Sequence, residues 1–454
     1  MNFYFFCFLF YRFAAFSIFL AFTFLFSLFL FLSDRFCDRM DSSNQNSVNE
    51  SNRQTERLQE CLRSMGISNS GTFKNEQQER LLKAVCFSRN NVFAVLPTGS
   101  GKSLAFFCNA LINNSQVTVV VVPLIALQKN LLEKSSQYGI TASVSLDDVH
   151  RVSLLILSYD DCLNSRFNSR MAVLAGSGYF NRIMIDEAHC SIVDASFRES
   201  MFEIDRFRAL GVPFVLLTAT CPAYVKNGLK KKFFPLGCFK MIQYSSNRKN
   251  LQYSIVKTDN LFEKIEHLVW NKLRQLSTSG ETSDAKGIIF FNCKTMLEGV
   301  HDKFKKANLV CSRYYSDLVT KEEEFCRWQN GLSPIILCTS AFGLGVDIPN
   351  VSFVYFCGLP YSVIDFVQQA GRAGRGGQNG EVKLVFSSSN EWARIRCMGQ
   401  CEQAIRIQEL LQIIQSKRCI RAALTEYIDS SVITCLDDDE QLRCSNCSNS
   451  EDDE

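Results

Sequence analysis

The stretch that decides the fold is LPTGSGKS, residues Leu96–Ser103, which lies between two apolar segments. The residues before it, 92–96, predict a short buried strand, and the apolar residues after it predict a helix. Gly99 and Gly101 allow the backbone to curl so that several N–H groups face one point, where the helix N-terminus adds partial positive charge. A strand, a glycine loop, a Lys-Ser pair and a helix in this order predict a phosphate-binding loop. The alternative is a glycine-rich turn with an incidental lysine.

Each residue of this loop has an expected role. Lys102 can reach the β- and γ-phosphates of a nucleotide, and the hydroxyl of Ser103 can bind Mg²⁺. The nucleotide-binding residues expected in the loop are Pro97, Thr98, Gly99, Ser100, Gly101, Lys102 and Ser103.

Further apolar runs predict a sheet around this loop. Residues 117–122 are a run of β-branched residues, which is typical of a strand buried on both faces of a parallel sheet. Residues 154–158, 183–185 and 214–218 repeat the pattern, and helical stretches separate them. This alternation predicts an α/β domain with a parallel sheet, whose ligands bind at the carboxyl ends of the strands. The phosphate loop, DEAH (186–189) and TAT (218–220) all fall at such ends.

Two adjacent carboxylates follow one of these strands. Asp186 is expected to hold Mg²⁺, directly or through water, and Glu187 to orient or deprotonate an attacking water. An isolated Asp-Glu pair is usually a solvated strand end. Here the preceding apolar strand and the upstream phosphate loop favour the catalytic interpretation.

Composition sets the limits of the chain. Its 454 residues predict two to three domains, and 46% hydrophobic with 21% charged residues is ordinary for a globular protein. The net charge of +3 excludes a strongly basic protein, so any nucleic-acid contact must come from local grooves. Most of the twenty cysteines are scattered singly through apolar segments, which favours reduced thiols in an intracellular protein over a disulfide framework.

The N-terminal region differs from the rest. Residues 1–40 are rich in Phe, and residues 13–32 carry no charge, which is long enough for a transmembrane helix of ~20 residues. Two interpretations stay open: a membrane-spanning segment, or low-complexity sequence that has no role in the fold. Residues 41–70 read as a polar linker, disordered up to about Asn52, followed by a short helix that stops at Gly66.

Together, TGSGKS, DEAH and TAT resemble the motifs of superfamily 2 helicases, and further segments resemble the RecQ-like DNA helicases. The resemblance covers about residues 70–448. It rests on TFKNEQQERLLKAV (72–85), VVPLIALQKN (121–130), SSNRKNLQYSI (245–255), KGIIFFNCKT (286–295), ILCTSAFGLGVDIPNVSFVYFCGLP (336–360) and FVQQAGRAGRGG (366–377).

The resemblance implies two tandem RecA-like domains and further site residues. Adenine-reading residues are expected at Phe73, Lys74 and Gln77, and Asp347 is expected to bind the ribose or the nucleotide edge. Arg372 and Arg375, on a glycine-rich turn of the second domain, are expected to act as arginine fingers on the γ-phosphate. The remaining implied residues are His189 and Gln368 as catalytic residues, and Thr218 and Thr220 as the hydroxyls that couple the ATP site to the strand site.

The expected domains follow from these motifs. Residues 71–243 form the ATP-binding helicase domain and residues 244–395 the second helicase domain. Residues 396–450 form a small helical zinc-binding subdomain, and residues 451–454 an acidic tail. We expect a fungal-type short form of the family, without the winged-helix and accessory domains that follow the zinc segment in many relatives.

Four C-terminal cysteines are the expected zinc ligands. Cys444 and Cys447 form a C-x₂-C pair, the spacing of structural zinc sites. With Cys419 and Cys435 they match the layout of the family's zinc subdomain and would close a tetrahedral site. The alternative is a set of scattered reduced thiols, and Cys397 and Cys401 look helical and less suited as ligands.

The resemblance implies an ATP-dependent DNA helicase with ATP, Mg²⁺ and structural Zn²⁺ as cofactors. It is expected to move 3′ to 5′ on single-stranded DNA, to unwind duplex DNA in recombination and repair, and to reside in the nucleus. Membrane association through residues 13–32 is the alternative location, and a membrane-anchored ATPase the corresponding function. The loop after DEAH lacks the family's Trp, although Phe197 and Arg198 match, so coupling of strand binding to hydrolysis is expected to be altered. An RNA helicase and a nucleic-acid-binding protein with weakened unwinding stay as alternatives.

Overall fold

The computed structural model describes residues 46–163, 165–194, 204–235, 237–278, 285–342 and 350–448. The chain divides into two units, residues 1–57 and 58–454, and the described part of the first is the beginning of helix α2 (Asn46–Ser64). The apolar segment 13–32 lies outside the described residues. Among the residues that are described, no helix is long and apolar enough to cross a bilayer.

Helix α2 starts earlier than the sequence predicts. The linker was expected to stay disordered to about Asn52, but the helix begins at Asn46. The amide of Gln54 donates to the carboxylate of Glu50 at 3.3 Å, one turn earlier, because residues four apart lie on one face of a helix. The helix stops before Gly66, whose φ of +67° is the left-handed conformation that ends helices, as predicted.

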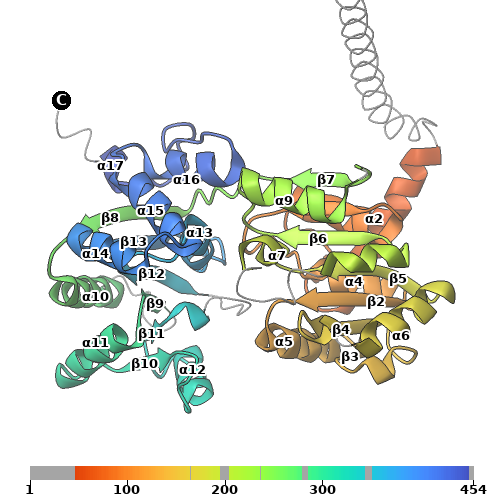
Figure 1. Ribbon diagram of the computed structural model, residues 1–454, viewed down its shortest axis with the longest axis horizontal. Helices are drawn as coiled ribbons and strands as arrows, with labels where there is room; N and C mark the ends of the chain where they lie inside the picture. The colour runs from red at the N-terminus through yellow and green to blue at the C-terminus, as the bar shows by residue number, and fades with distance from the viewer. Residues whose placement is uncertain are drawn as a thin grey trace, which may run out of the picture. The chain divides into compact units, whose positions relative to one another are not determined.

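The first domain is built on a seven-stranded sheet in which every pair of neighbours is parallel (Figure 1). The predicted strands at 117–122, 154–158 and 214–218 are confirmed residue for residue. The strand order is β3-β4-β2-β5-β6-β1-β7. The bounds are β1 (Val92–Val95), β2 (Val117–Val122), β3 (Ala142–Ser143), β4 (Leu154–Ser158), β5 (Phe180–Ile185), β6 (Phe214–Thr218) and β7 (Lys240–Gln243).

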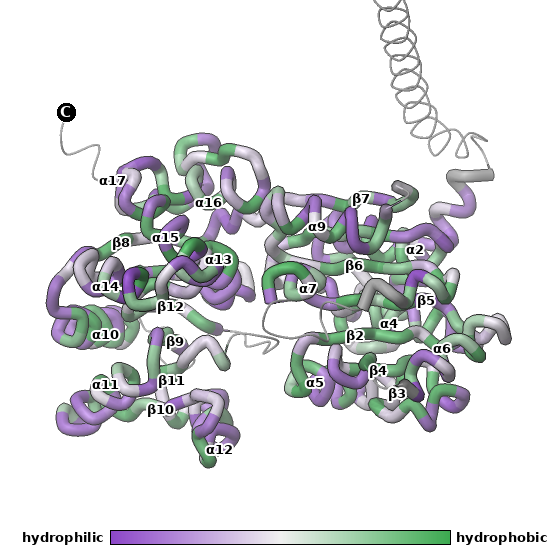
Figure 2. Tube along the Cα trace, in the orientation of Figure 1, coloured by the Kyte–Doolittle hydropathy of each residue, from purple (hydrophilic) through white to green (hydrophobic). Residues whose placement is uncertain are grey.

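Helices cover both faces of this sheet because its central strands are apolar on both sides. In β2, Val120 and Val122 belong to a core with helices α3, α4 and α5, whereas Val119 and Val121 belong to a core with α6 and α9. Figure 2 shows the resulting hydrophobic colour along β2 and β6. The bounds are α3 (Glu76–Phe87), α4 (Leu104–Ile112), α5 (Ile125–Gln137), η1 (Leu146–Asp148), η2 (Asp161–Leu163), α6 (Ser165–Gly176), α7 (Cys190–Val193), η3 (Ile204–Leu210) and α9 (Ala223–Phe233).

The second domain repeats this design with a six-stranded, all-parallel sheet of order β10-β11-β9-β12-β13-β8. The bounds are β8 (Leu251–Lys257), α10 (Leu261–Thr278), β9 (Lys286–Phe291), α11 (Lys294–Lys306), β10 (Cys311–Tyr314), α12 (Lys321–Gln329), β11 (Ile335–Cys338), η4 (Ser340–Phe342), β12 (Val351–Cys357), α13 (Val363–Ala370) and β13 (Gly380–Phe386). The predicted fold of two tandem parallel-sheet α/β domains is confirmed.

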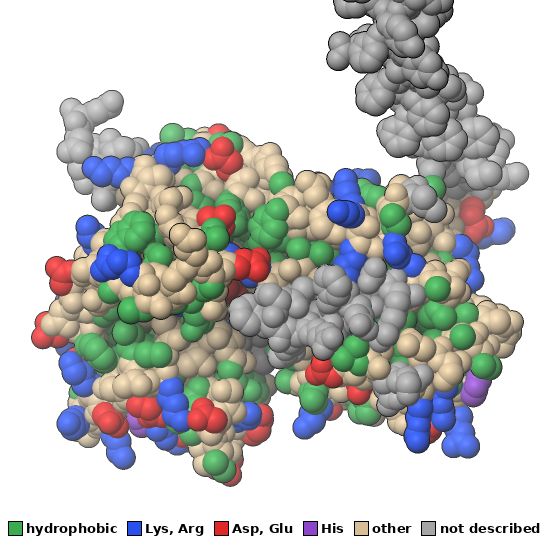
Figure 3. All heavy atoms as spheres, in the orientation of Figure 1, with side chains coloured by type: hydrophobic (Ala, Val, Ile, Leu, Met, Phe, Trp, Pro, Cys, Tyr) green, Lys and Arg blue, Asp and Glu red, His purple; other side chains and the backbone are tan. Residues whose placement is uncertain are grey.

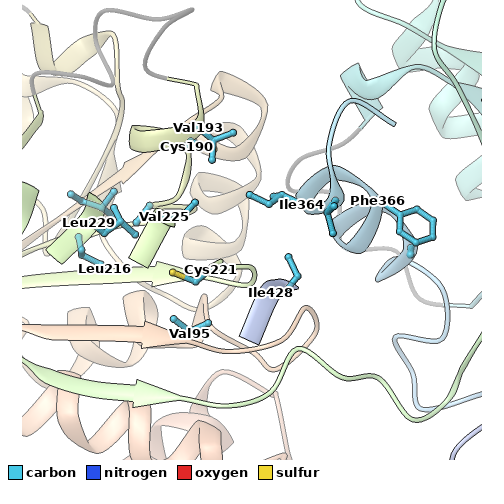
Figure 4. Close-up of a cluster of buried hydrophobic side chains, with 14 of the residues drawn as sticks. Val95, Cys190, Val193, Leu216, Cys221, Val225, Leu229, Ile364, Phe366 and Ile428 are labelled. Atoms are coloured by element: carbon cyan, nitrogen blue, oxygen red, sulfur yellow. The ribbon is translucent and has the colours of Figure 1, made fainter. Parts of the chain in front are cut away.

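Four further helices follow the second sheet: α14 (Ser388–Met398), α15 (Glu402–Gln415), α16 (Ile420–Asp429) and α17 (Ser445–Ser448). One apolar cluster joins them to both domains. In Figure 4, Ile364 of α13 and Ile428 of α16 lie beside Val193 of α7 and Val225 of α9. The described core is therefore shared between the two sheets and the C-terminal helices.

Candidate active site

The phosphate loop joins β1 to α4, as predicted. Gly99 and Gly101 have φ values of +76° and +83°, which side-chain-bearing residues rarely adopt. A Cβ on Gly101 would lie 2.3 Å from Nε2 of Gln78, so the amide of Gln78 would have to move to admit a side chain there. The loop is therefore shaped by glycine where the backbone must turn its N–H groups inward.

Lys102 lies at the floor of the loop. Its ammonium donates to the carbonyl oxygens of Leu96 at 3.0 Å and Pro97 at 3.2 Å. Desolvation lowers the pKa of Lys102, whereas the nearby carboxylates of Glu187 and Asp186 raise it. A lysine held among carbonyls and carboxylates is placed to receive a phosphate group.

Asp186 and Glu187 follow the end of β5 and face the same cavity. Desolvation and the neighbouring Glu187 raise the pKa of Asp186, while Lys102 lowers it. Glu187 has a φ of +45°, an uncommon conformation for a residue with a side chain, and its N–H donates to Oδ1 of Asp186 at 3.0 Å. Backbone strain of this kind persists where the surrounding structure enforces it, which is common at functional sites.

His189 connects the two domains. Its Nδ1 lies 2.9 Å from Oγ1 of Thr218 and 3.3 Å from Oε2 of Glu187. Its Nε2 lies 3.0 Å from Nε2 of Gln368 on α13, which also donates to Oγ1 of Thr220 at 3.0 Å. Because the Gln368 amide nitrogen can only donate, the His189 tautomer that fits carries its proton on Nδ1. DEAH, TAT and the second domain are thus joined by one hydrogen-bond network.

A single cavity of about 170 Å³ gathers most of the predicted residues. Its walls come from the phosphate loop, from the end of β5, and from α13 and the turn after it. Helix α5 supplies a further wall that the sequence analysis missed, in which Leu127, Asn130, Leu131 and Lys134 share one face at helical spacing. The other lining residues are Thr98, Gly99, Gly101, Lys102, Ser103, Asp186, Glu187, Gln368, Arg372 and Arg375.

The two predicted arginine fingers reach this cavity from the second domain. Cγ of Arg375 lies 4.0 Å from the place of a Cβ on Gly99, so the side chain sits directly over the phosphate loop. Arg372 is 4% exposed, and its guanidinium lies 5.8 Å from the centre of the Phe342 ring. Both side chains line the cavity, and Arg375 does so beside the phosphate loop.

The segment before the phosphate loop contacts it through Lys74 and through Gln78, a residue for which the sequence predicted no role. Lys74 donates from Nζ to the carbonyl of Gly99 at 2.8 Å. Gln78 is buried and donates to the carbonyl of Ser100 at 3.4 Å, while Oε1 of Gln78 accepts from the N–H of Lys74 at 2.9 Å. Gln77 and Phe73 are half-buried, and their expected role toward adenine stays a prediction. The two adjacent glutamines offered no local signal to separate them.

Some predicted residues cannot be placed. Asp347 lies outside the described residues, as do Phe197 and Arg198 in the segment after DEAH. Their roles stay predictions.

The four predicted zinc ligands lie together. The Sγ atoms of Cys419, Cys435, Cys444 and Cys447 are all within 4.8 Å of one another, and those of Cys419 and Cys435 are 3.6 Å apart. A tetrahedral zinc with Zn–S bonds of ~2.3 Å separates its sulfurs by about 3.8 Å, so the cluster fits the metal.

Two families match the chain by sequence. Residues 75–227 match the DEAD/DEAH box helicase family, and residues 265–377 match the helicase conserved C-terminal domain. The two matches lie on the two parallel-sheet domains.

Two curated relatives match most of the chain. The ATP-dependent DNA helicase RecQ of Bacillus subtilis is 24% identical over 82% of this chain and 64% of its own length. The RecQ-like DNA helicase BLM of Xenopus laevis is 28% identical over 73% of this chain and 25% of its own length. The chain therefore spans less than two thirds of these relatives.

Two solved structures have a similar fold. Dbp5 of S. cerevisiae, bound to RNA and ADP BeF3, matches with a TM-score of 0.59 at 18% identity, over 78% of this chain and 90% of that one. The DEAD-box helicase Mss116, bound to ssRNA and UDP-BeF, matches with a TM-score of 0.56 at 18% identity, over 72% and 73%. At these identities the likeness concerns the fold alone. The chain is therefore similar in sequence to the DEAD/DEAH box helicase family over residues 75–227 and to the helicase conserved C-terminal domain over residues 265–377, and the curated relatives named above are DNA helicases of the RecQ type.

Proposed function

We propose that the chain is an ATP-dependent DNA helicase that moves 3′ to 5′ along single-stranded DNA and unwinds duplex DNA. One observation carries the proposal: a single cavity is lined by the phosphate loop and acidic pair of the first domain and by Gln368, Arg372 and Arg375 of the second. A nucleotide in that cavity would touch both domains. Its binding and hydrolysis would therefore change how the domains approach each other.

The residues present fit a magnesium nucleotide. Backbone N–H groups of the glycine loop and Lys102 would hold the β- and γ-phosphates, and Ser103 and Asp186 would hold Mg²⁺, which neutralises phosphate charge. Glu187 would orient the attacking water and accept its proton. Arg372 and Arg375 would neutralise the charge that develops on the γ-phosphate.

The His189 network supports coupling between hydrolysis and motion. His189 touches the proposed base Glu187 with one ring nitrogen and the second domain with the other. Separation of the domains would break the bonds of Gln368 to His189 and Thr220. His189, the neighbour of the carboxylate that would handle water, would then lose the bond that fixes its ring.

Contact with the nucleic acid is proposed to be local and independent of sequence. On the face drawn in Figure 3, basic and acidic side chains are interspersed, in keeping with a net charge of +3. Scattered Lys and Arg side chains and backbone N–H groups suit contacts to the phosphates of a single strand. An RNA strand would present the same phosphates, so the test below includes RNA.

We also propose that the four-cysteine cluster holds a structural Zn²⁺. The C-terminal segment that carries it is small, and Cys435 and Cys444 are 3% and 0% exposed although short loops surround them. Closed four-sulfur sites stabilise small segments of this kind. A role in recombination and repair and a nuclear location are proposals from the family resemblance, and membrane association would require residues 13–32.

The decisive experiment measures ATP turnover of the purified chain without nucleic acid, with single-stranded DNA and with single-stranded RNA. Unwinding is then followed on duplexes that carry either a 3′ or a 5′ single-stranded tail. Stimulation by DNA and unwinding of the 3′-tailed duplex are expected. Stimulation by RNA alone would replace the proposal with an RNA helicase. Tight strand binding without turnover would replace it with a binding protein.

A further inference from the structure

The segment that joins the two domains spans residues 244–250, and residues 245–249 of it are held by α16 and by the loop that follows this helix. Oδ2 of Asp429, at the end of α16, accepts from Oγ of Ser245 at 2.8 Å and from the N–H and Oγ of Ser246 at 2.7 and 3.0 Å. Further along, the N–H of Leu442 donates to the carbonyl of Lys249 at 3.0 Å. A segment with so many fixed backbone groups is not a loose linker.

Arg248, within this segment, reaches the edges of the nucleotide cavity. Its Nη1 lies 3.4 Å from the carbonyl of Thr98 in the phosphate loop and 3.4 Å from the carbonyl of Gly371 in the second domain. Its Nη2 donates to the carbonyls of Ala373 at 3.2 Å and Gly374 at 2.7 Å. One guanidinium therefore bonds both segments that carry the phosphate-contacting residues.

Those two segments meet at this point. Oγ1 of Thr98 donates to the carbonyl of Gly371 at 3.3 Å. A Cβ on Gly371 would lie 2.4 Å from the same Oγ1 of Thr98. Among the described residues, the Arg248 guanidinium donates to neutral oxygens of Thr98, Asn250, Gly371, Ala373 and Gly374. The guanidinium fork of Arg248 has a fixed geometry, so it satisfies the phosphate-loop and Gly371 carbonyls together only at one separation of the segments.

A second arginine, which is buried, fixes the backbone of Arg248. Arg421 of α16 is 1% exposed, and its Nη1 donates to the carbonyl of Arg248 at 2.8 Å and to Oδ1 of Asn247. Its Nη2 donates to the carbonyls of Leu251 at 2.8 Å and Leu442 at 3.0 Å. Leu442 precedes the cysteine pair of the cluster by two residues. A continuous set of bonds thus runs from the cysteine cluster to the nucleotide cavity.

We propose that Arg248 is a positioning residue that sets the approach of the Arg372–Arg375 turn to the phosphate loop, and that Arg421 connects it to the C-terminal subdomain. The proposal rests on the proposed ATPase function and concerns the control of that same site. Arg248 touches carbonyls at the rim of the cavity rather than its floor, so it acts through the arginine fingers and not on the nucleotide.

The test compares Arg248→Met, Arg248→Lys and a control, Lys249→Met, in the full chain. Lys249 is the next residue of the same segment, but its ammonium is exposed and pairs with Asp438. Turnover at saturating ATP and single-stranded DNA is expected to fall about 10²-fold in Arg248→Met, since small misplacements of catalytic groups cost this much. The KM for ATP should change less than about threefold, because the phosphate loop itself is intact. Arg248→Lys should not restore turnover, because a point charge cannot span both segments.

Arg421→Met supplies the second arm. It should lower the same turnover, and the double variant with Arg248→Met should turn over about as fast as Arg248→Met alone, because residues that act through one another are not additive. If the losses of turnover in the two single variants multiply in the double variant, Arg421 does not act through Arg248. If turnover of Arg248→Met stays within twofold of wild type, Arg248 has no positioning role. If Arg248→Met does not fold, normal turnover in a folded Arg248→Lys would overturn it equally. A wild-type chain without ATPase overturns the proposed function itself, whereas an active wild type with active variants overturns only this inference.

Discussion

Replacing Gln368 by Ala tests whether the bridge between the two domains controls hydrolysis. The side chain is 9% exposed and makes two bonds of 3.0 Å, one to His189 and one to Thr220, both in the other domain. A neutral hydrogen bond contributes ~1 kcal/mol net, so the variant loses about 2 kcal/mol of the contact that assembles the site. At about 1.4 kcal/mol for each factor of ten, DNA-stimulated turnover should fall about 30-fold.

The assay measures steady-state phosphate release at saturating single-stranded DNA, together with the affinity for a fluorescent ATP analogue. Affinity should change little, because the phosphate loop and Lys102 are untouched. Gln369→Ala is the matched control: the neighbouring glutamine is also buried, at 6% exposure, but it does not line the nucleotide cavity. An equal fall in both variants, or turnover of Gln368→Ala within twofold of wild type, would refute the reasoning.

Three other outcomes are expected. Glu187→Gln should bind ATP with wild-type affinity while phosphate release falls at least about 10²-fold, because the amide cannot accept the proton of water; normal release would remove Glu187 from the mechanism. Arg375→Ala should lower turnover about 10³-fold with nearly unchanged ATP affinity, and lost affinity at unchanged turnover would show that it merely holds the nucleotide. Metal analysis should find about one zinc per chain, and Cys444→Ser should lose it and lower the thermal midpoint, whereas Cys397→Ser, an exposed cysteine outside the cluster, should do neither.

The strands were predictable because of where they are buried. A strand such as β2, covered on both faces, is expected to be almost entirely apolar, and its five valines with one buried threonine indicate such a strand. The phosphate loop and the acidic pair follow such strands directly, so their common edge could be inferred as well. The early start of α2 could not be predicted. Its first turns are stabilised by hydrogen bonds between polar residues one turn apart, which leave no apolar periodicity in the sequence.

Contacts between distant segments could not be predicted from the sequence. His189 and Gln368 are 179 residues apart, and their bond depends on how two separate sheets pack together. The same holds for Arg248, because its contacts with Thr98 and Gly371 also depend on how the two domains pack together. The wall formed by α5 was missed for a simpler reason: Asn130 and Lys134 are ordinary residues of an amphipathic helix until the neighbouring cavity is known.

The shared apolar cluster of Figure 4 has a thermodynamic consequence. Any opening of the cavity that separates Ile364 and Ile428 from Val193 and Val225 would expose hydrocarbon to water. Closure would therefore carry a negative heat capacity change, and its apolar part would weaken on cooling. The hydrogen bonds of Gln368 lack this dependence, so the two kinds of contact that hold the domains together respond differently to temperature. In the proposed motor, temperature would therefore shift the balance between these two kinds of contact.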